Sequence, residues 1–373
     1  MAVLGSGGFA TVEEYLFIES TTWSPWCDCV ALVTVVGGGG SGARGQYVSS
    51  SYYNACATGG GAGAAAKSKL TLSKDVTYTI TAGARGAAPA ANTTGAAGNA
   101  GGTSSFTGSD ITDMSANGGA AGAFATGNPH QNVSCSGVSG GAAGSTGNLW
   151  NTAGGGAGSI TLSFTSPGTP GNHYSNSYGT GGGSVGIFGY NGFSSGNVAN
   201  STHTVYQDRF CATGGAGTGA GTGTIDPNQG EFGGEGGPGL KGATTPNDNN
   251  LGQTAAPDNL MGYPPNNYFT YHYGDSTIPV YHTGWLSGNY TAHAEAGIGV
   301  GGRSQSSNNT GACAGFFAGG GCQIGSGSQT KSGGNAFLGG GGGPYLAHDS
   351  GTNNQPGAGG HGFIHIQIIK WNI

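Results

Sequence analysis

This chain has 373 residues, of which 84 are glycine and only 7% are charged, whereas an average protein has about 7% glycine and about 25% charged residues. Disordered chains are usually highly charged and poor in aromatic residues, so the low charge together with 16 Tyr, 14 Phe and 5 Trp argues for a folded protein. The ten Lys and Arg residues and the net charge of −6 exclude nucleic acid as a partner, because binding to phosphate backbones needs a basic surface.

Four segments have the pattern of β-strands. Residues 30–36 are apolar and β-branched, and residues 69–81 predict a hairpin that turns at 73–75. Residues 159–165 show a weaker strand signal of the same kind. Residues 363–371 alternate apolar and polar positions. We expect 30–36 to pair with 363–371, because both are apolar, similar in length and next to a glycine block. No window has the 3.6-residue apolar period of a helix, so almost no helix is expected.

Glycine blocks separate these strand segments. They lie at 37–45, 59–63, 118–122, 154–158, 181–183, 214–223, 233–239, 319–327 and 339–343. A left-handed extended glycine helix has no internal hydrogen bonds, so its donors and acceptors must find partners on neighbouring segments. Because glycine has no Cβ, such segments can approach one another on every side. The predicted fold is therefore mostly irregular and β: packed extended polyglycine II-type rods with a few short β-strands and hairpins, and almost no helix.

The sequence offers no constellation for catalysis or metal binding. Glu231 and Glu235 are conceivable as a glycosidase pair, but the glycines around them indicate a solvated loop. His361 and His365 are predicted on one face of the last strand, without a third ligand for a metal. We therefore expect no enzyme activity, no catalytic residue, no bound metal and no cofactor.

The cysteines and the first residues bear on the environment of the protein. There are seven cysteines, at Cys27, Cys29, Cys56, Cys135, Cys211, Cys313 and Cys322. Because the number is odd, at least one is free or pairs between chains, and the pairing of the others stays open. The first nine residues contain neither a basic region nor a long apolar run, so we expect no signal peptide.

Aromatic residues gather in the segment 261–290, among amide, hydroxyl and imidazole side chains. Aromatic faces beside polar donors are typical of surfaces that bind sugars or protein loops. The candidate receptor-binding residues are Tyr268, Tyr271, Tyr273, Tyr281 and Trp285, together with Tyr174 and Tyr178 from a second cluster of the same character. The alternative is that these rings form the hydrophobic core of the domain.

Several motifs together resemble the glycine-rich domains of phage tail fibre proteins. Thr22-Trp-Ser-Pro25 leads into Val33-Thr-Val-Val-Gly-Gly-Gly-Gly40, as in the opening of those domains. Gly101-Gly-Thr-Ser-Ser-Phe106 and the closing Gly357-Ala-Gly-Gly-His-Gly362 also match their pattern. The resemblance covers the N-terminal third and the last few tens of residues, whereas residues from about 125 to 335 depart from it with longer loops.

The resemblance implies a virion protein of the phage tail or fibre, assembled in the host cytoplasm without a signal peptide. Its function would be that of an adhesin, in which glycine-rich rods display loops that bind a host surface receptor, either a glycan or an outer-membrane protein. Residues 1–21 are predicted to attach to another virion tail or fibre protein. Residues 22–373 then form the glycine-rich domain, with long variable loops between about 125 and 335. Assembly into a homo-oligomer stays open.

Two alternatives belong to other functional classes. The chain could be a structural virion protein, such as a collar, baseplate or capsid-decorating protein, without receptor binding. It could instead be an extracellular eukaryotic protein, because Asn92, Asn132, Asn200, Asn289 and Asn308 occupy glycosylation sequons. The expected absence of a signal peptide argues against the second alternative.

Overall fold

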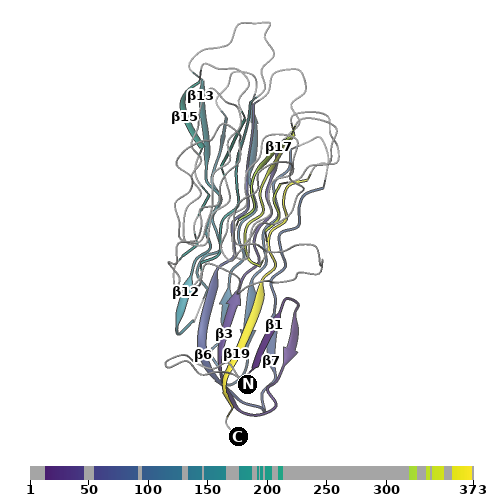
Figure 1. Cartoon of the computed structure of the whole chain (residues 1–373), viewed down its shortest axis with the longest axis vertical. Coiled ribbons are helices and arrows are strands. Elements are labelled where there is room, and N and C mark those ends of the chain that lie inside the picture. Colours follow the sequence, from purple (N-terminus) through teal and green to yellow (C-terminus); the bar gives the residue numbers. More distant parts are fainter. Residues whose placement is uncertain are drawn as a thin grey trace, which may run out of the picture.

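The computed structural model describes residues 13–45, 54–90, 95–127, 133–144, 147–164, 176–186, 191–192, 194–195, 198–203, 209–212, 319–325, 333–336, 338–347 and 355–371. Within these ranges the chain forms strands and irregular segments but no helix. The molecule is elongated, with strands at both ends and glycine-rich segments running between them (Figure 1). We call the end with the first and last described strands the base, and the opposite end the tip.

Two antiparallel sheets form the base. The larger has the order β1-β19-β3-β6-β12, with β1 at Glu13–Phe17, β19 at Phe363–Trp371, β3 at Cys29–Val36, β6 at Ala65–Leu72 and β12 at Trp150–Thr152. The smaller has the order β2-β7-β8-β9, with β2 at Thr21–Trp23, β7 at Tyr78–Thr81, β8 at Ser104–Thr107 and β9 at Met114–Ala116. Buried side chains from both sheets join in one core, so the sheets enclose it between them.

Along the base strands, every second side chain points into this core. On β19 the side chains of Ile364, Ile366 and Ile368 are fully buried, while His365 and Gln367 between them are half-buried. Burying an apolar side chain of this size contributes about 1.5–3 kcal/mol. The period of two seen in the sequence thus reflects a sheet with one face in the core.

The predicted pairing of residues 30–36 with 363–371 is confirmed. β3 and β19 are antiparallel neighbours, with Val33 opposite Ile366, and the register shifts between Ile368 and Lys370. Two segments from opposite ends of the chain therefore lie in the centre of the larger base sheet. The apolar composition of both strands made them suited to this central position.

The predicted hairpin over 69–81 is wrong. β6 pairs with β3 and β12, whereas β7 pairs with β2 and β8 in the other sheet. The chain crosses between the sheets because Leu72 and Ile80 are both buried in the core that the sheets share. Tyr78 fixes the crossing: its hydroxyl accepts a hydrogen bond from the Ser73 backbone N–H at 2.8 Å and donates one to Asp110 at 2.7 Å.

Three smaller sheets form the tip. The first has the order β10-β5-β14-β16, with β10 at Phe124–Gly127, β5 at Asn54–Thr58, β14 at Asn176–Thr180 and β16 at Arg209–Ala212. The second has the order β11-β13-β15, with β11 at Val133–Cys135, β13 at Ile160–Phe164 and β15 at Val198–His203. The third has the order β17-β18-β4, with β17 at Gln323–Gly325, β18 at Tyr345–Ala347 and β4 at Arg44–Gly45. β13 confirms the weaker strand signal at 159–165.

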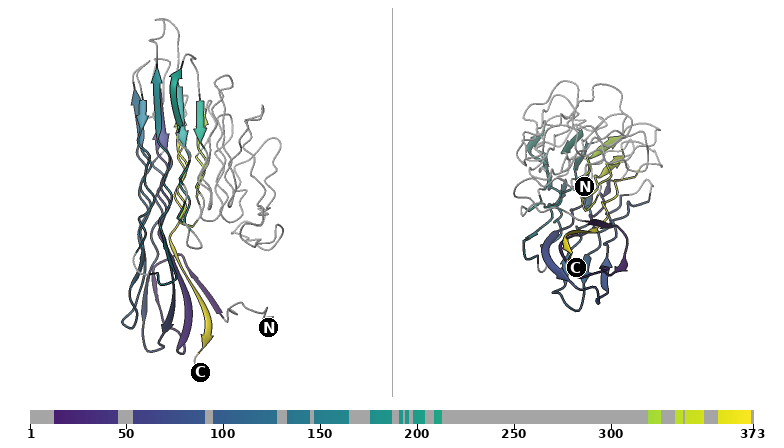
Figure 2. Two further views of the ribbon diagram at one scale, coloured as in Figure 1. Left: turned by 90° about the vertical axis from the view of Figure 1, so that its left-hand side faces the viewer. Right: turned by 60° about the horizontal axis from the view of Figure 1, so that its bottom comes forward.

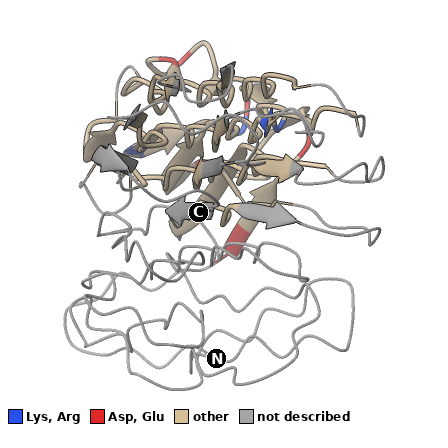
Figure 3. Cartoon of the chain, turned by 90° about the horizontal axis from the view of Figure 1, so that it is seen from above, with Lys and Arg blue, Asp and Glu red and all other residues tan. Residues whose placement is uncertain are grey.

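Glycine-rich segments connect the strands of the base to those of the tip. Residues 37–43 run from β3 to β4, residues 59–64 from β5 to β6, and residues 117–123 from β9 to β10. Viewed along the long axis, the described segments lie in rows above one another (Figure 3). Their backbone hydrogen bonds go to other segments of the chain.

Residues 37–44, which we call the central segment, donate hydrogen bonds with a period of three residues. Gly37, Gly40 and Ala43 donate to Ala64, Gly61 and Thr58 at 2.9, 2.8 and 3.0 Å; Gly38, Ser41 and Arg44 donate to Gly102, Asn99 and Ala96; and Gly39 and Gly42 donate to Gly360 and Gly357. Successive residues therefore bond to three different neighbours, and every third residue returns to the same one.

The carbonyl groups of the central segment accept hydrogen bonds from three further neighbours. Gly119 and Gly122 donate to Gly38 and Ser41, Gly342 and Tyr345 donate to Gly40 and Ala43, and Gly86 donates to Gly39. Three segments that accept and three that donate surround the central segment. The backbone polar groups of this buried chain thus find partners in every direction, as burial requires.

Close approach, rather than an unusual backbone angle, explains the glycines at these positions. A Cβ atom on Gly40 would overlap the carbonyl oxygen of Ala120, and one on Gly42 would overlap that of Gly343. Among the described residues, only Gly339 has a positive φ, of 79°. The absence of a side chain therefore matters mainly because backbone lies directly against backbone.

Candidate functional site

The chain reverses repeatedly at the tip. Figure 2 shows the long described segments that run between the two ends of the molecule. β4 follows β3 of the base through residues 37–43, and β5 leads back to β6 of the base through residues 59–64, so residues 46–53 connect two segments that end at the tip. The same holds for the described flanks of six other connections. These are 91–94, 128–132, 165–175, 204–208, 326–332 and 348–354. All seven connections themselves lie outside the described residues.

A small core joins two of the three tip sheets, the one that contains β5 and the one that contains β4 and β18. Ala43, Ala55, Ala57, Cys322 and Leu346 form it and are fully buried. The small side chains allow the sheets to pack closely. The flanks of the connections are thus held in place by packed strands, which is a suitable support for binding loops.

A buried arginine and tyrosine lie at the end of the glycine segments. Arg44 and Tyr345 are both fully buried and occupy opposite positions in β4 and β18. Burial lowers the pKa of the Arg44 guanidinium, and the nearby Tyr345 opposes this effect. Arginine remains charged in proteins, so this side chain places a positive charge in the buried interior of the tip.

The predicted receptor-binding residues mostly lie outside the described part of the chain. This applies to Tyr268, Tyr271, Tyr273, Tyr281, Trp285 and Tyr174. Tyr178 lies in β14 at the tip, opposite Cys56 of β5 and Phe210 of β16. Tyr174 belongs to the connection 165–175, whose described flanks are both at the tip.

The two described ends of the chain lie at the base. β1 begins at Glu13 and pairs with β19, which ends at Trp371. β1 falls within the segment 1–21 that was predicted to attach to a partner. Its Tyr15 and Phe17 pack against the base core, so this part of the segment is also an edge strand of the larger base sheet.

Apolar side chains are exposed at the base. Leu16 on β1 is 56% exposed, and Trp26 is 64% exposed. The ring of Trp26 lies 4.7 Å from that of Trp371, centroid to centroid. Large exposed apolar side chains of this kind are often found at surfaces that contact other proteins.

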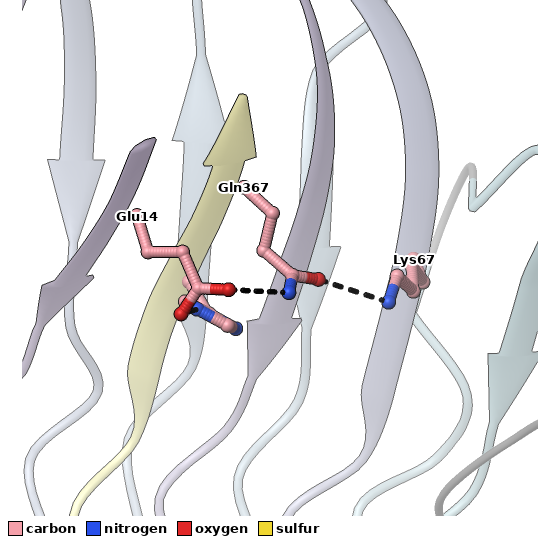
Figure 4. A network of polar contacts seen from close by, with 4 residues as sticks. Glu14, Lys67 and Gln367 are labelled. Carbon is pink, nitrogen blue, oxygen red and sulfur yellow. Dashed lines mark hydrogen bonds and ion pairs between the residues drawn. The ribbon is translucent and has the colours of Figure 1, made fainter. Parts of the chain in front are cut away.

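A network of polar side chains crosses the outer face of the larger base sheet (Figure 4). The Gln367 amide donates to the Glu14 carboxylate at 3.0 Å, and the Lys67 ammonium donates to the Gln367 carbonyl oxygen at 3.4 Å. Burial lowers the pKa of Lys67, and the negative charge of Glu14 opposes this. The network joins the edge strand β1 to β19 and β6, and we interpret it as structural.

His365 lies beside this network, as predicted for a sheet-surface histidine. Its Nε2 is 3.5 Å from a Glu14 carboxylate oxygen. Burial lowers its pKa more strongly than Glu14 raises it. The predicted sharing of a strand face with His361 is wrong, because His361 is exposed and precedes β19.

Within the described residues, no group of three or more His, Cys, Asp or Glu side chains is arranged to hold a metal ion. The same ranges contain no helix that is long and apolar enough to cross a membrane. Glu231 and Glu235 lie outside the described residues. Few of the described residues are coloured as Lys, Arg, Asp or Glu in the view along the long axis (Figure 3).

The tip connections were missed as a group by the sequence reasoning, although a signal for them exists. Residues 46–53 read Gln-Tyr-Val-Ser-Ser-Ser-Tyr-Tyr, and this run separates two glycine blocks. Tyrosine and serine in such a run are typical of adaptable binding surfaces. The topology adds the information that this connection and 165–175 start and finish at the same end of the molecule.

The family model described as a glycine-rich domain matches residues 16–240, which is more than half of the chain. The match begins within β1 and includes most of the strands of both ends. No curated protein matches the chain.

Proposed function

We propose that this chain, which belongs to the glycine-rich domain family, is a phage tail fibre adhesin that recognises a receptor on the host cell surface, as its sequence resemblance to phage tail fibre domains implies. It acts by binding, without catalysis and without a cofactor. The observation that carries the proposal is the polarity of the molecule. Both described chain ends lie at the base, whereas the flanks of seven connections lie at the tip.

The glycine segments serve this function as polyglycine II-type rods. In that conformation there are three residues per turn, so residues i and i+3 point in the same direction. The three-residue period of the hydrogen bonds from Gly37, Gly40 and Ala43 to a single neighbour supports this conformation. With a rise of about 3.1 Å per residue, the seven residues from 37 to 43 separate base and tip by roughly 20 Å. Rods bonded on all sides form a stiff support for the connections at their ends.

The tip connections and the aromatic segment provide the receptor contacts. Tyr174 in the connection 165–175, and Tyr268, Tyr271, Tyr273, Tyr281 and Trp285, are the proposed contacts, with Tyr178 in the strand that follows 165–175. Rigid aromatic side chains bury a large area at little cost in conformational entropy. They suit a glycan, whose rings stack on aromatic faces, and they also suit loops of an outer-membrane protein.

The base is the proposed attachment site for another virion tail or fibre protein. The exposed Leu16 and Trp26 provide apolar area for this contact. Attachment at the base directs the tip away from the particle. The protein then resides in the virion, after assembly in the host cytoplasm.

Competition for adsorption tests the proposal. Purified full-length protein is added to host bacteria before the phage that carries this chain, and the rate of phage adsorption is measured. An adhesin occupies the receptors and slows adsorption in a concentration-dependent way. An equal concentration of heat-unfolded protein is the control. If saturating protein does not slow the adsorption of virions that contain this chain, the chain is instead a structural virion protein.

A further inference from the structure

Two cysteines that are far apart in the sequence meet at the tip. Cys56 in β5 and Cys135 in β11 are separated by 79 residues and are 0% and 3% exposed. The Cys135 thiol donates a hydrogen bond to the Cys56 carbonyl oxygen at 3.2 Å. β5 belongs to the four-stranded tip sheet and β11 to the three-stranded sheet with β13 and β15, so this contact is made between two sheets.

We propose that Cys56 and Cys135 form a disulfide bond that joins these two tip sheets when the protein meets an oxidising medium. Both residues hold free thiols in the structure. Hydrogen bonding with the Cys135 thiol, followed by burial, raises the pKa of Cys56 above its ordinary value. The Cys56 thiol is therefore protonated at neutral pH, and the Cys135 thiol lies against the Cys56 backbone.

Thiol–disulfide exchange with a low-molecular-weight disulfide supplies the chemistry. A thiolate from one cysteine attacks the small disulfide, which forms a mixed disulfide and releases one small thiolate. The second cysteine then attacks the protein sulfur of the mixed disulfide and releases the other. The two protons from the cysteines go to the two released thiolates. Because both cysteines are buried in the folded protein, exchange takes place while the tip sheets are transiently open or not yet packed.

The bond would act directly on the support of two tip connections. β5 follows residues 46–53, and β11 follows residues 128–132. A disulfide limits the freedom of the unfolded chain most when it closes a long loop, and here the loop includes the glycine blocks at 59–63 and 118–122. Cys27 and Cys29 lie at the base and cannot substitute for either partner. The inference does not depend on the adhesin proposal.

The experiment compares the full-length protein after incubation with oxidised glutathione and after reduction with dithiothreitol. Remaining thiols are alkylated, and peptides are mapped by mass spectrometry without reduction. We expect a peptide pair linked through Cys56 and Cys135 in the oxidised sample. Closing a loop of this length should raise the melting temperature of the oxidised protein by roughly 5–10 °C relative to the reduced protein.

Two variants define the origin of the shift. Cys135→Ala should lose both the linked peptides and the difference between the oxidised and reduced melting temperatures, whereas the matched variant Cys27→Ala should keep both. Alkylation of Cys56 and Cys135 in the oxidised wild type, or linkage of either to a different cysteine, would overturn the proposal. This result is read from the wild-type protein, so it stands even where a variant folds poorly.

Discussion

Gly341 lies against Gly60 so closely that a Cβ atom on Gly341 would overlap the Gly60 carbonyl oxygen. The Gly341 backbone N–H also donates to Gly183 at 3.0 Å, so the segment is bonded to one neighbour and packed against another. Neither neighbour can move away without breaking its own hydrogen bonds, since Gly60 donates to Gly342 and Gly183 donates to Gly60. Contact between backbones is thus the structural basis of the glycine content.

Gly341→Val should prevent folding. The added side chain collides with backbone atoms rather than with a flexible side chain, so the strain has no local relief, and the cost should exceed about 4 kcal/mol. Soluble yield and a thermal melt followed by circular dichroism measure the effect. Ala143→Val, at an exposed position in another glycine-rich segment, is the control and should melt like the wild type. A cooperative wild-type melt for Gly341→Val would refute tight backbone packing.

Ile366→Ala should destabilise the base by about 2–5 kcal/mol, the range for removing most of a buried isoleucine side chain. Ile366 is fully buried and opposite Val33 in the centre of the larger base sheet. Ile369 lies on the same strand but is only half-buried, next to the shift in register. Ile369→Ala should therefore cost clearly less in a urea titration. Equal costs for the two variants would contradict the register of β19.

Stability should fall as the pH drops below about 6.5, in part because of His365. Burial lowers its pKa in the folded state below the ordinary value of 6.5, despite Glu14. The unfolded chain therefore binds a proton more readily, so stability is complete above the unfolded pKa and is lost as the pH falls through the folded pKa. Glu14 and Lys67 are the charged groups beside it.

Urea midpoints at pH 7.5 and 5.5 test this dependence. His365→Gln removes the titrating group, so the decrease between the two pH values should be smaller in the variant than in the wild type. His361, whose pKa is lowered by partial burial and by the charge of Arg85, accounts for part of the decrease that remains. An identical decrease in the variant and the wild type would show that His365 does not contribute.

Some strand pairings in this fold follow from local sequence patterns, whereas others depend on residues far away in the chain. The strands 30–36 and 363–371 were predictable because their own apolar patterns define a central position in a sheet. The segment 69–81 was misjudged because its local pattern is the same for a hairpin and for a crossing between sheets. The choice depends on β2, β3 and β8, which lie elsewhere in the chain.

The candidate site was less accessible to sequence reasoning than the fold. Glycine blocks indicate extended segments, but their direction follows only from which strands they connect. For this reason the shared location of the flanks of 46–53 and 165–175 could not be inferred from composition. The meeting of Cys56 with Cys135 likewise depends on the packing of two sheets and has no signal in the spacing of the cysteines.

Substitutions at the proposed receptor contacts and at the base should have opposite effects on adsorption and on incorporation into particles. Replacing Trp285 and Tyr271 by alanine should impair adsorption while leaving the melting temperature and incorporation into particles unchanged. An aromatic anchor at an interface typically contributes about 2 kcal/mol or more, which corresponds to a loss of roughly thirtyfold in affinity. Several copies on one particle would amplify the loss.

Changes at the base should have the reverse effect. Leu16→Ser with Trp26→Ser replaces exposed apolar side chains, so the purified protein should fold and compete for host receptors as the wild type does, yet it should be incorporated poorly into particles. Immunoblots of purified virions measure incorporation, and adsorption rates of the same virions measure receptor binding.

Normal adsorption of virions that carry the Trp285 and Tyr271 substitutions would remove these residues from the binding surface. Tyr174→Ala in the connection 165–175 would then be the next variant to measure, because both described flanks of that connection are at the tip.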